Sequence, residues 1–207
     1  RIDGRGGSER LGRTRDDAAG EAFDKVAQAL GLPYPGGPVV DRLARRGDSR
    51  AVPLPRPRLD GAPFDFSFSG LKSAAIRWID RHRLAPTDEA SASGGVCDLL
   101  ASFEAAVVDQ LLAPLPELVE RHRPELIAAS GGVAANTSLR ARLVEAGATL
   151  GVEVRLPPRA LTTDNAAMIA RAGQLALVRG DRHDPRRLDA QARQAWQPPG
   201  MRSARVG

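Results

Sequence analysis

Apolar residues recur at helical spacing in several stretches of the chain. Within residues 16–32 they fall three and four positions apart, as on one face of a helix that Asp16 or Asp17 can cap and Gly31 can end. Similar spacing recurs along the chain, with a break near Pro114 and Pro116. The predicted helices cover residues 16–32, a short part of 33–47, 71–82, 97–122, 130–147 and 162–180.

Three segments have patterns typical of strands. Residues 64–70 alternate aromatic and polar side chains, which predicts a half-buried strand. Short apolar runs at 125–130 and 152–158 predict two further strands, of which the first is buried and the second is halted by two prolines. Helices come first, followed by strand, glycine turn, helix, strand and helix. This order predicts an α/β fold, in which ligands bind at the carboxyl ends of the strands.

Composition narrows the class of protein. Of the 207 residues, 42% are hydrophobic and 27% charged, as in folded globular proteins. The most apolar stretch carries Asp98, Glu104 and Asp109, which argues against a simple membrane-spanning helix. The first fifteen residues contain no apolar run typical of a secretory signal, and Cys97 is the single cysteine, so no disulfide framework is expected. We therefore predict a cytoplasmic protein that does not interact with membranes.

The basic residues are almost all arginine. The net charge is +5, and only Lys25 and Lys72 among the 30 basic residues are lysines. Arginine favours planar, bidentate partners such as phosphate, which is consistent with an RNA partner. A general arginine bias of the source organism would explain the same composition, so both interpretations stay open.

The most informative candidate site lies where a predicted strand meets a predicted helix. Gly131 and Gly132 follow the apolar run, and Asn136 comes shortly after them. Glycines let a ligand approach the backbone, and a helix N-terminus favours phosphate. Asn136 can donate and accept hydrogen bonds to a ribose or a base, or it can simply cap the helix.

Acidic residues crowd the first predicted helix. Asp17, Glu21 and Asp24 fall on one side of it, which is unfavourable unless a partner neutralises them. They form either a solvated face or a carboxylate set for ligand hydroxyl groups. The rigid turn at residues 34–38 gives close access to its backbone and precedes Asp41.

Two further features have competing interpretations. Asp164 stands at the start of the last predicted helix, as an N-cap or as one ligand of a divalent metal. The three histidines are far apart in the sequence, so spacing alone indicates no complete metal site. The aromatic residues of 64–70 either pack in the core, which we favour, or form a platform for bases.

Five motifs in order resemble one known family, the TsaD family of tRNA N6-adenosine threonylcarbamoyltransferases. The resemblance covers roughly residues 9–198. The motifs are GEAFDKVA (20–27), YPGGP (34–38), FDFSFSGLK (64–72), SGGVAAN (130–136) and TDNAAMIA (163–170). The family's earlier lobe, with a His-x-x-x-His motif and a Ser-Gly-Gly loop, has no counterpart here. Because no Met opens the chain, we expect the later part of a longer protein.

The resemblance implies an actin/sugar-kinase/Hsp70-like (ASKH) fold, mainly its C-terminal lobe. We accordingly divide the chain into a ragged start (1–15), an ASKH-type nucleotide-binding region (16–180) and an Arg-rich tail (181–207). The implied reaction transfers a threonylcarbamoyl group from threonylcarbamoyl-AMP to N6 of the adenosine 3′ of the anticodon in tRNAs that read ANN codons. The implied partners are tRNA, a paralogous subunit and a P-loop ATPase.

The resemblance also implies roles for individual residues. The family motifs place substrate-binding groups at Asp24, Gly37, Asp41, Gly131, Gly132 and Asn136. They place one ligand of a divalent metal, iron in the first instance, at Asp164, with histidine ligands outside this chain. No general base is implied. Thr162 stands where the family often has Cys, and Pro114 and Pro116 interrupt a helix that is continuous in the family.

Three alternatives compete with this enzyme. The chain as it stands could be a non-catalytic piece that binds only nucleotide or a partner subunit. A general basic RNA-binding module would need a recognisable RNA-binding signature, which we do not find. A hydrogenase-maturation carbamoyltransferase has a related fold, but it lacks the register from GEAFDK to YPGGP.

Overall fold

A computed structural model describes residues 1–3, 8–57, 59–180, 182 and 184. The chain divides into two compact units, of which the larger comprises Gly12–Thr163 and the smaller Arg1–Leu11 with Asp164–Gly207. Most of the predicted Arg-rich tail, 181–207, lies outside the described residues.

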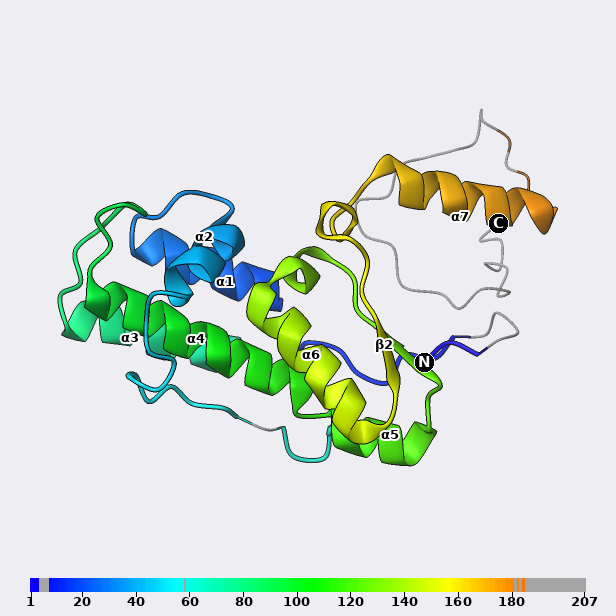
Figure 1. The fold of residues 1–207 in the computed structure, drawn as a ribbon, viewed down its shortest axis with the longest axis horizontal. Helices are drawn as coiled ribbons and strands as arrows, with labels where there is room; N and C mark the ends of the chain where they lie inside the picture. The colour runs from blue at the N-terminus through cyan, green and yellow to red at the C-terminus, as the bar shows by residue number, and fades with distance from the viewer. Residues whose placement is uncertain (4–7, 58, 181, 183, 185–207) are drawn as a thin grey trace, which may run out of the picture. The chain divides into compact units, whose positions relative to one another are not determined.

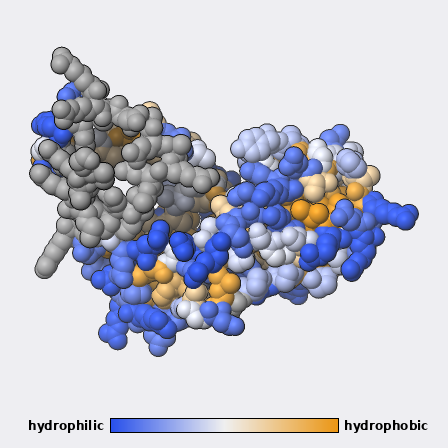
Figure 2. All heavy atoms as spheres, turned by 180° about the vertical axis from the view of Figure 1, so that it is seen from behind, coloured by the Kyte–Doolittle hydropathy of each residue, from blue (hydrophilic) through white to orange (hydrophobic). Residues whose placement is uncertain are grey.

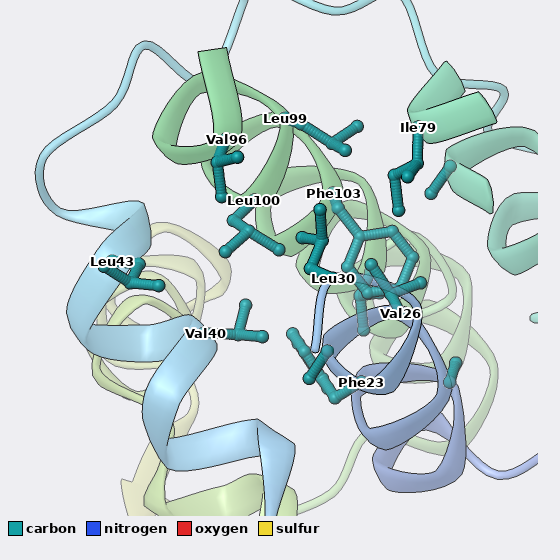
Figure 3. Packing of buried hydrophobic residues seen from close by; sticks show 14 of the residues in the cluster. Phe23, Val26, Leu30, Val40, Leu43, Ile79, Val96, Leu99, Leu100 and Phe103 are labelled. Carbon is teal, nitrogen blue, oxygen red and sulfur yellow. The ribbon is translucent and has the colours of Figure 1, made fainter. Parts of the chain in front are cut away.

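Helices form the core of the larger unit (Figure 1). The first four are α1 (Ala19–Ala29), α2 (Gly36–Ala44), α3 (Ser69–Arg81) and α4 (Gly94–Leu112). α4 packs against both α2 and α3, and α1 packs against the same two helices. The labelled side chains of Figure 3 come from these four helices and from Leu30, directly after α1. They gather in one cluster, in which the rings of Phe23 and Phe103 meet edge to face at 5.5 Å. The apolar residues that recur at helical spacing in the sequence are therefore the ones that form the core.

The predicted break in the long helix is confirmed. α4 ends at Leu112 and α5 (Leu115–His122) begins directly after Pro114, with Pro116 in its first turn. Proline has no N–H group and its ring clashes with the preceding turn, so it is tolerated at the start of a helix and not inside one. The two prolines thus convert one apolar helical pattern into two helices.

A small parallel sheet follows the helices. β1 (Leu126–Ala128) pairs with β2 (Glu153–Arg155), with Ile127 opposite Val154. The connection runs through the short 3-10 helix η1 (Gly132–Ala135) and α6 (Thr137–Leu150). The α/β prediction is confirmed, but the first strand is not buried as predicted. Only its central residue is half-buried, and α6 packs against the neighbouring strand β2.

The packing of α6 against β2 depends on a glycine. A Cβ atom added at Gly147 would lie 2.3 Å from Cγ2 of Val154, which is closer than real carbon atoms approach. The helix therefore lies directly on the strand.

The predicted strand at residues 64–70 is wrong. Phe66 makes one isolated parallel bridge with Thr14, and α3 already begins at Ser69. The carboxylate of Asp16 accepts hydrogen bonds from the backbone N–H groups of Phe68 (2.8 Å) and Ser69 (3.2 Å). A helix start has N–H groups without partners, and here a carboxylate from about fifty residues earlier in the chain binds them.

Two of the three aromatic residues of this segment pack in or against the core, as we favoured, whereas Phe64 lies against His122 at 5.9 Å. Phe68 is only 2% exposed, and the ring of Phe66 stacks on it at 6.1 Å. Asp16, by contrast, does not cap α1 as predicted. The N-cap of α1 is Ala18, which makes no side-chain hydrogen bond.

The smaller unit contains α7 (Ala166–Val178), preceded in the larger unit by the 3-10 helix η2 (Arg159–Leu161). No residue of α7 is buried. On the face shown in Figure 2, apolar surface forms separate patches among hydrophilic surface. In the described part of the chain, no helix is both long enough and apolar enough to cross a membrane.

Candidate functional site

Asp24 joins the first two helices. It lies on α1, and its Oδ1 accepts a hydrogen bond of 2.8 Å from the backbone N–H of Gly36, the first residue of α2. An added Cβ at Gly36 would lie 2.5 Å from Cβ of Ala27, so the two helices meet at backbone distance. Among the described residues no partner contacts the other carboxylate oxygen of Asp24.

The next glycine has the opposite surroundings. An added Cβ at Gly37 would meet no atom within 4 Å. The space beside this backbone is therefore open, as it must be if a ligand is to approach the chain there.

A buried polar cluster connects α2, α4 and α6. We call Asp41, Glu104, Asn136 and Thr137 the Asn136 cluster. Nδ2 of Asn136 donates to Oδ1 of Asp41 at 3.1 Å and to Oε1 of Glu104 at 2.6 Å. Asp41 also accepts from the backbone N–H of Thr137 at 2.7 Å, from its hydroxyl at 2.9 Å, and from Arg45 at 2.6 Å. Asp41, Glu104 and Asn136 are each less than a tenth exposed.

Burial dominates the electrostatics of this cluster. It raises the pKa of Glu104 to about 7, because a charged carboxylate is poorly solvated in the interior, and the negative charge of Asp41 acts in the same direction. The hydrogen bond from Asn136 and the positive charge of Arg45 oppose the rise. Glu104 is consequently part neutral and part charged near pH 7.

Asn136 caps α6, as one of its two interpretations predicts. Its Oδ1 accepts from the backbone N–H of Leu139 at 2.8 Å. Both protons of its amide are used by Asp41 and Glu104, so what it can offer a ligand is the remaining lone pair of Oδ1. Its role in substrate binding stays a prediction.

The predicted glycine turn is present between β1 and η1. Gly131 has φ 93°, in the region that favours glycine, and its N–H donates to the carbonyl of Thr162 at 2.9 Å. Gly132 is exposed, and an added Cβ there would be 4.0 Å from Cγ2 of Thr163. The turn leads into η1, which lies against α1, with Gly20 facing Val133.

The crowded acidic residues of α1 are neutralised by lysine. We call Asp17, Glu21, Lys25 and Lys72 the Asp17 cluster. Lys25 pairs with Asp17 at 3.0 Å and with Glu21 at 2.7 Å, and Lys72 pairs with the second oxygen of Asp17. Hydrogen bonds from Lys72 and then Lys25 lower the pKa of Asp17, and those to Glu21 and Asp17 raise the pKa of Lys25. Asp24 does not share these lysine contacts, because its Oδ1 binds the N–H of Gly36 instead. A ligand-binding role of these carboxylates stays a prediction.

Asp164 belongs to the smaller unit. It does not cap α7, because Asn165 does so by accepting from the backbone N–H of Met168 at 3.0 Å. Asp164 is exposed. The described residues contain no group of three His, Cys, Asp or Glu side chains that could hold a metal ion, so they do not form a metal site by themselves.

Comparison with known proteins decides between the families considered. The model of the TsaD family, tRNA N6-adenosine threonylcarbamoyltransferase, matches residues 2–171. The chain belongs to this family. The finding excludes the carbamoyltransferase of hydrogenase maturation and the general RNA-binding module as family assignments.

Curated relatives support the same family. A tRNA N6-adenosine threonylcarbamoyltransferase of Anaeromyxobacter sp. (strain Fw109-5) is 47% identical over 90% of this chain and 54% of its own length. Those of Moorella thermoacetica and Rhodospirillum rubrum are 50% and 51% identical over 83% of this chain and 48% of their own lengths. The chain thus spans about half the length of the curated relatives it matches.

The structure brings together only some of the residues that the family resemblance selects. Asp41 and Asn136 are in direct contact. Asp24 binds the N–H of Gly36, the residue before Gly37 at the start of α2. Sequence reasoning missed Glu104, although a carboxylate in the middle of the most apolar stretch was a signal.

Proposed function

We propose that the chain forms the substrate-binding part of a tRNA N6-adenosine threonylcarbamoyltransferase with the ASKH fold. The observation that carries the proposal is the junction of α1 and α2, where Asp24 binds the backbone N–H of Gly36 beside the open backbone of Gly37. A carboxylate with a free oxygen beside an uncovered backbone suits the ribose of an adenylate. Membership of the TsaD family supports that assignment.

The remaining predicted residues would frame the same ligand. The turn at Gly131 and Gly132 admits an adenylate or threonyl group close to the backbone, and Asn136 offers one lone pair. Asp41 acts indirectly, since its oxygens are occupied by Asn136, Thr137 and Arg45. It holds Asn136 in place.

In the proposed reaction, N6 of the tRNA adenosine attacks the carbamoyl carbon of threonylcarbamoyl-AMP. A C–N bond forms, the bond from that carbon to the phosphate oxygen breaks, AMP leaves, and N6 loses one proton. An exocyclic amine of adenine is a weak nucleophile, so holding the two substrates in line supplies much of the rate. We assign no residue of this chain as the general base.

Further parts of the proposal concern groups that the chain does not hold alone. Asp164 would supply one oxygen ligand to a divalent metal, iron in the first instance, whose other ligands are not among the described residues. The tRNA is the proposed second substrate. A paralogous subunit and a P-loop ATPase are the proposed partners, in the cytoplasm.

Nucleotide binding tests the central assignment. We expect the chain to bind AMP, and Asp24→Asn to weaken that binding about tenfold by loss of a charge-assisted hydrogen bond. Asp80→Asn is the matched control, because Asp80 is an exposed carboxylate on α3. Calorimetric titration of all three proteins gives the comparison. Equal affinity in the Asp24 variant would contradict the proposed role.

The alternative function is a non-catalytic piece that only binds nucleotide or a partner subunit. It is favoured by the absence of a complete metal-ligand set among the described residues. Assays of threonylcarbamoyladenosine formation with this chain alone and with this chain joined to the N-terminal half of a full-length relative separate the two. We expect activity only with the joined protein, whereas a joined protein that binds AMP but stays inactive would favour the non-catalytic piece.

A further inference from the structure

A hollow of about 490 Å³ lies between α2, α4 and α6, lined by residues to which neither the family motifs nor the proposed function assigns a role. Its volume is within the range of small-ligand sites. The polar groups used here are Arg50, Arg56, Glu104, Asp109, Ser138 and Arg142.

One wall of this hollow carries a buried carboxyl group without a full set of partners. Glu104 is 7% exposed, and its Oε1 accepts from Asn136. Within the described part of the chain, Oε2 has no hydrogen-bond partner. Oε2 is not among the buried side-chain atoms that lack a partner, so solvent reaches it, and the open space beside Glu104 is the hollow.

Positively charged arginine side chains predominate among the other residues that line the hollow. Arg56 and Arg142 both bind Asp109, Arg142 at 2.7 Å. Arg50 has no ion-pair or hydrogen-bond partner for its guanidinium group among the described residues. Three arginines therefore face one paired aspartate, which leaves a positive charge beside Glu104.

A helix terminus adds to this field. Ser138 lies in the first turn of α6, where the N–H groups of Thr137 and Leu139 already bind Asp41 and Asn136. The N–H of Ser138 has no partner among the described residues, and the helix N-terminus favours negative charge. The hydroxyl group of Ser138 can donate a further hydrogen bond to a ligand oxygen.

We propose that this hollow is a second binding site, specific for a phosphate group held by Arg50, Arg142 and the first turn of α6. Glu104 completes it as a hydrogen-bond donor. Because Oε1 accepts from Asn136, the proton of the neutral acid sits on Oε2, on the side of the hollow. A phosphate oxygen accepts from that proton.

Protonation of Glu104 then controls the affinity. The charged groups around it are Asp41 and Arg45 from α2, Asp109 from α4, Arg142 from α6, and Arg50 and Arg56 from the connecting loop. Glu104 has a pKa of about 7, so it gains a negative charge between pH 6 and pH 8 and repels the phosphate.

Sulfate is the probe of choice, because it is a dianion that does not titrate between pH 6 and pH 8. We expect it to bind the full chain at pH 6, and Arg50→Gln to weaken binding about tenfold by removing a charge-assisted hydrogen bond. Arg77→Gln is the matched control, an exposed arginine on α3 away from the hollow. No measurable sulfate binding, or equal losses in the two variants, would overturn the proposal.

The role of Glu104 has its own test. Sulfate affinity of the unmodified chain should fall severalfold from pH 6 to pH 8, whereas Glu104→Gln should bind with an affinity that does not depend on pH. The glutamine amide still accepts from Asn136, so the fold is retained. A Glu104→Gln protein with the same pH dependence as the unmodified chain would contradict the assignment. Asp24→Asn should leave sulfate binding unchanged, which separates this site from the proposed nucleotide site.

Two sources could supply the phosphate, namely the backbone of RNA and free phosphate. A short oligoribonucleotide distinguishes them. If Arg50→Gln weakens RNA binding more than Arg77→Gln does, the phosphate is that of RNA. If it weakens only sulfate binding, the site holds a free ion, and either result sustains the proposal. RNA and sulfate binding that are both insensitive to Arg50→Gln would refute it.

Discussion

The Asp17 cluster and the Asn136 cluster are built from similar acidic groups but balance them differently. In the first, Lys25 of α1 and Lys72 of α3 neutralise Asp17 at a partly exposed place. In the second, no lysine is present, and two carboxyl groups share the amide of Asn136 in the interior. Water screens the second arrangement less than the first, because Asp41, Glu104 and Asn136 are each less than a tenth exposed. Removing one partner should therefore cost little stability in the first place and much in the second, where it leaves buried carboxyl groups without a donor.

The largest expected effect comes from Asn136→Ala. It removes the cap of α6 and leaves two buried carboxyl groups without their shared donor, which should lower the free energy of unfolding by about 3 kcal/mol. Urea denaturation measures this value. Ser93→Ala removes only the exposed cap of α4 and should cost under about 1 kcal/mol. Equal decreases in the free energy of unfolding in the two variants would show that the burial of Asn136 adds nothing to its role as a cap.

The next effect depends on pH. The pKa of Glu104 is about 7 in the folded chain, above its value in the unfolded chain, so the folded state binds the proton more tightly. Its contribution to stability is complete below about pH 4.5 and is lost as the pH rises through 7. Glu104→Gln should remove this dependence and make the protein about 2 kcal/mol more stable at pH 8. Urea denaturation from pH 4.5 to 8 checks both statements, and a variant less stable than the unmodified chain at pH 8 would contradict them.

A smaller effect is expected in the Asp17 cluster. Asp17→Asn removes two ion pairs of a partly buried carboxylate and should cost about 1 kcal/mol, with less effect in high salt. The pKa of Asp17 is lowered in the folded chain, so its contribution is present at neutral pH and is lost as the pH falls below about 4. Thermal unfolding at low and high salt is the measurement. A loss of stability that is the same at low and high salt would indicate that the ion pairs of the Asp17 cluster are shielded from solvent.

The smallest effect should follow from Lys25→Gln. Its ammonium group is exposed, and Lys72 still neutralises Asp17 in the variant. We expect the melting temperature to stay within the error of the measurement. A clear decrease would mean that Lys25, rather than Lys72, holds the cluster together.

The sequence predicted those features that depend on neighbours along the chain. Helical spacing, the break at Pro114 and Pro116, and the cap at Asn136 all involve residues within a few positions of one another. The order of strands and helices likewise followed from local patterns. These predictions were confirmed because short-range geometry determines them.

Other features depend on residues far apart, and there prediction failed. The alternation at 64–70 looked like a strand, but Asp16 binds the backbone N–H groups that begin α3. Glu104 meets Asn136 only after α4 and α6 have packed together. The placement of Asp164 with respect to the residues of the larger unit stays a prediction.

The pairing of both lysines with Asp17 has a practical consequence. Reagents that attack primary amines have just two side chains to react with in the whole chain, Lys25 and Lys72, and these meet at one carboxylate. The side chain of Lys25 is 39% exposed and that of Lys72 only 17%, so acylation should begin at the former. Dyes or cross-linkers of this chemistry would label one small corner of the molecule, apart from the terminal amine, and leave every arginine-bearing surface untouched.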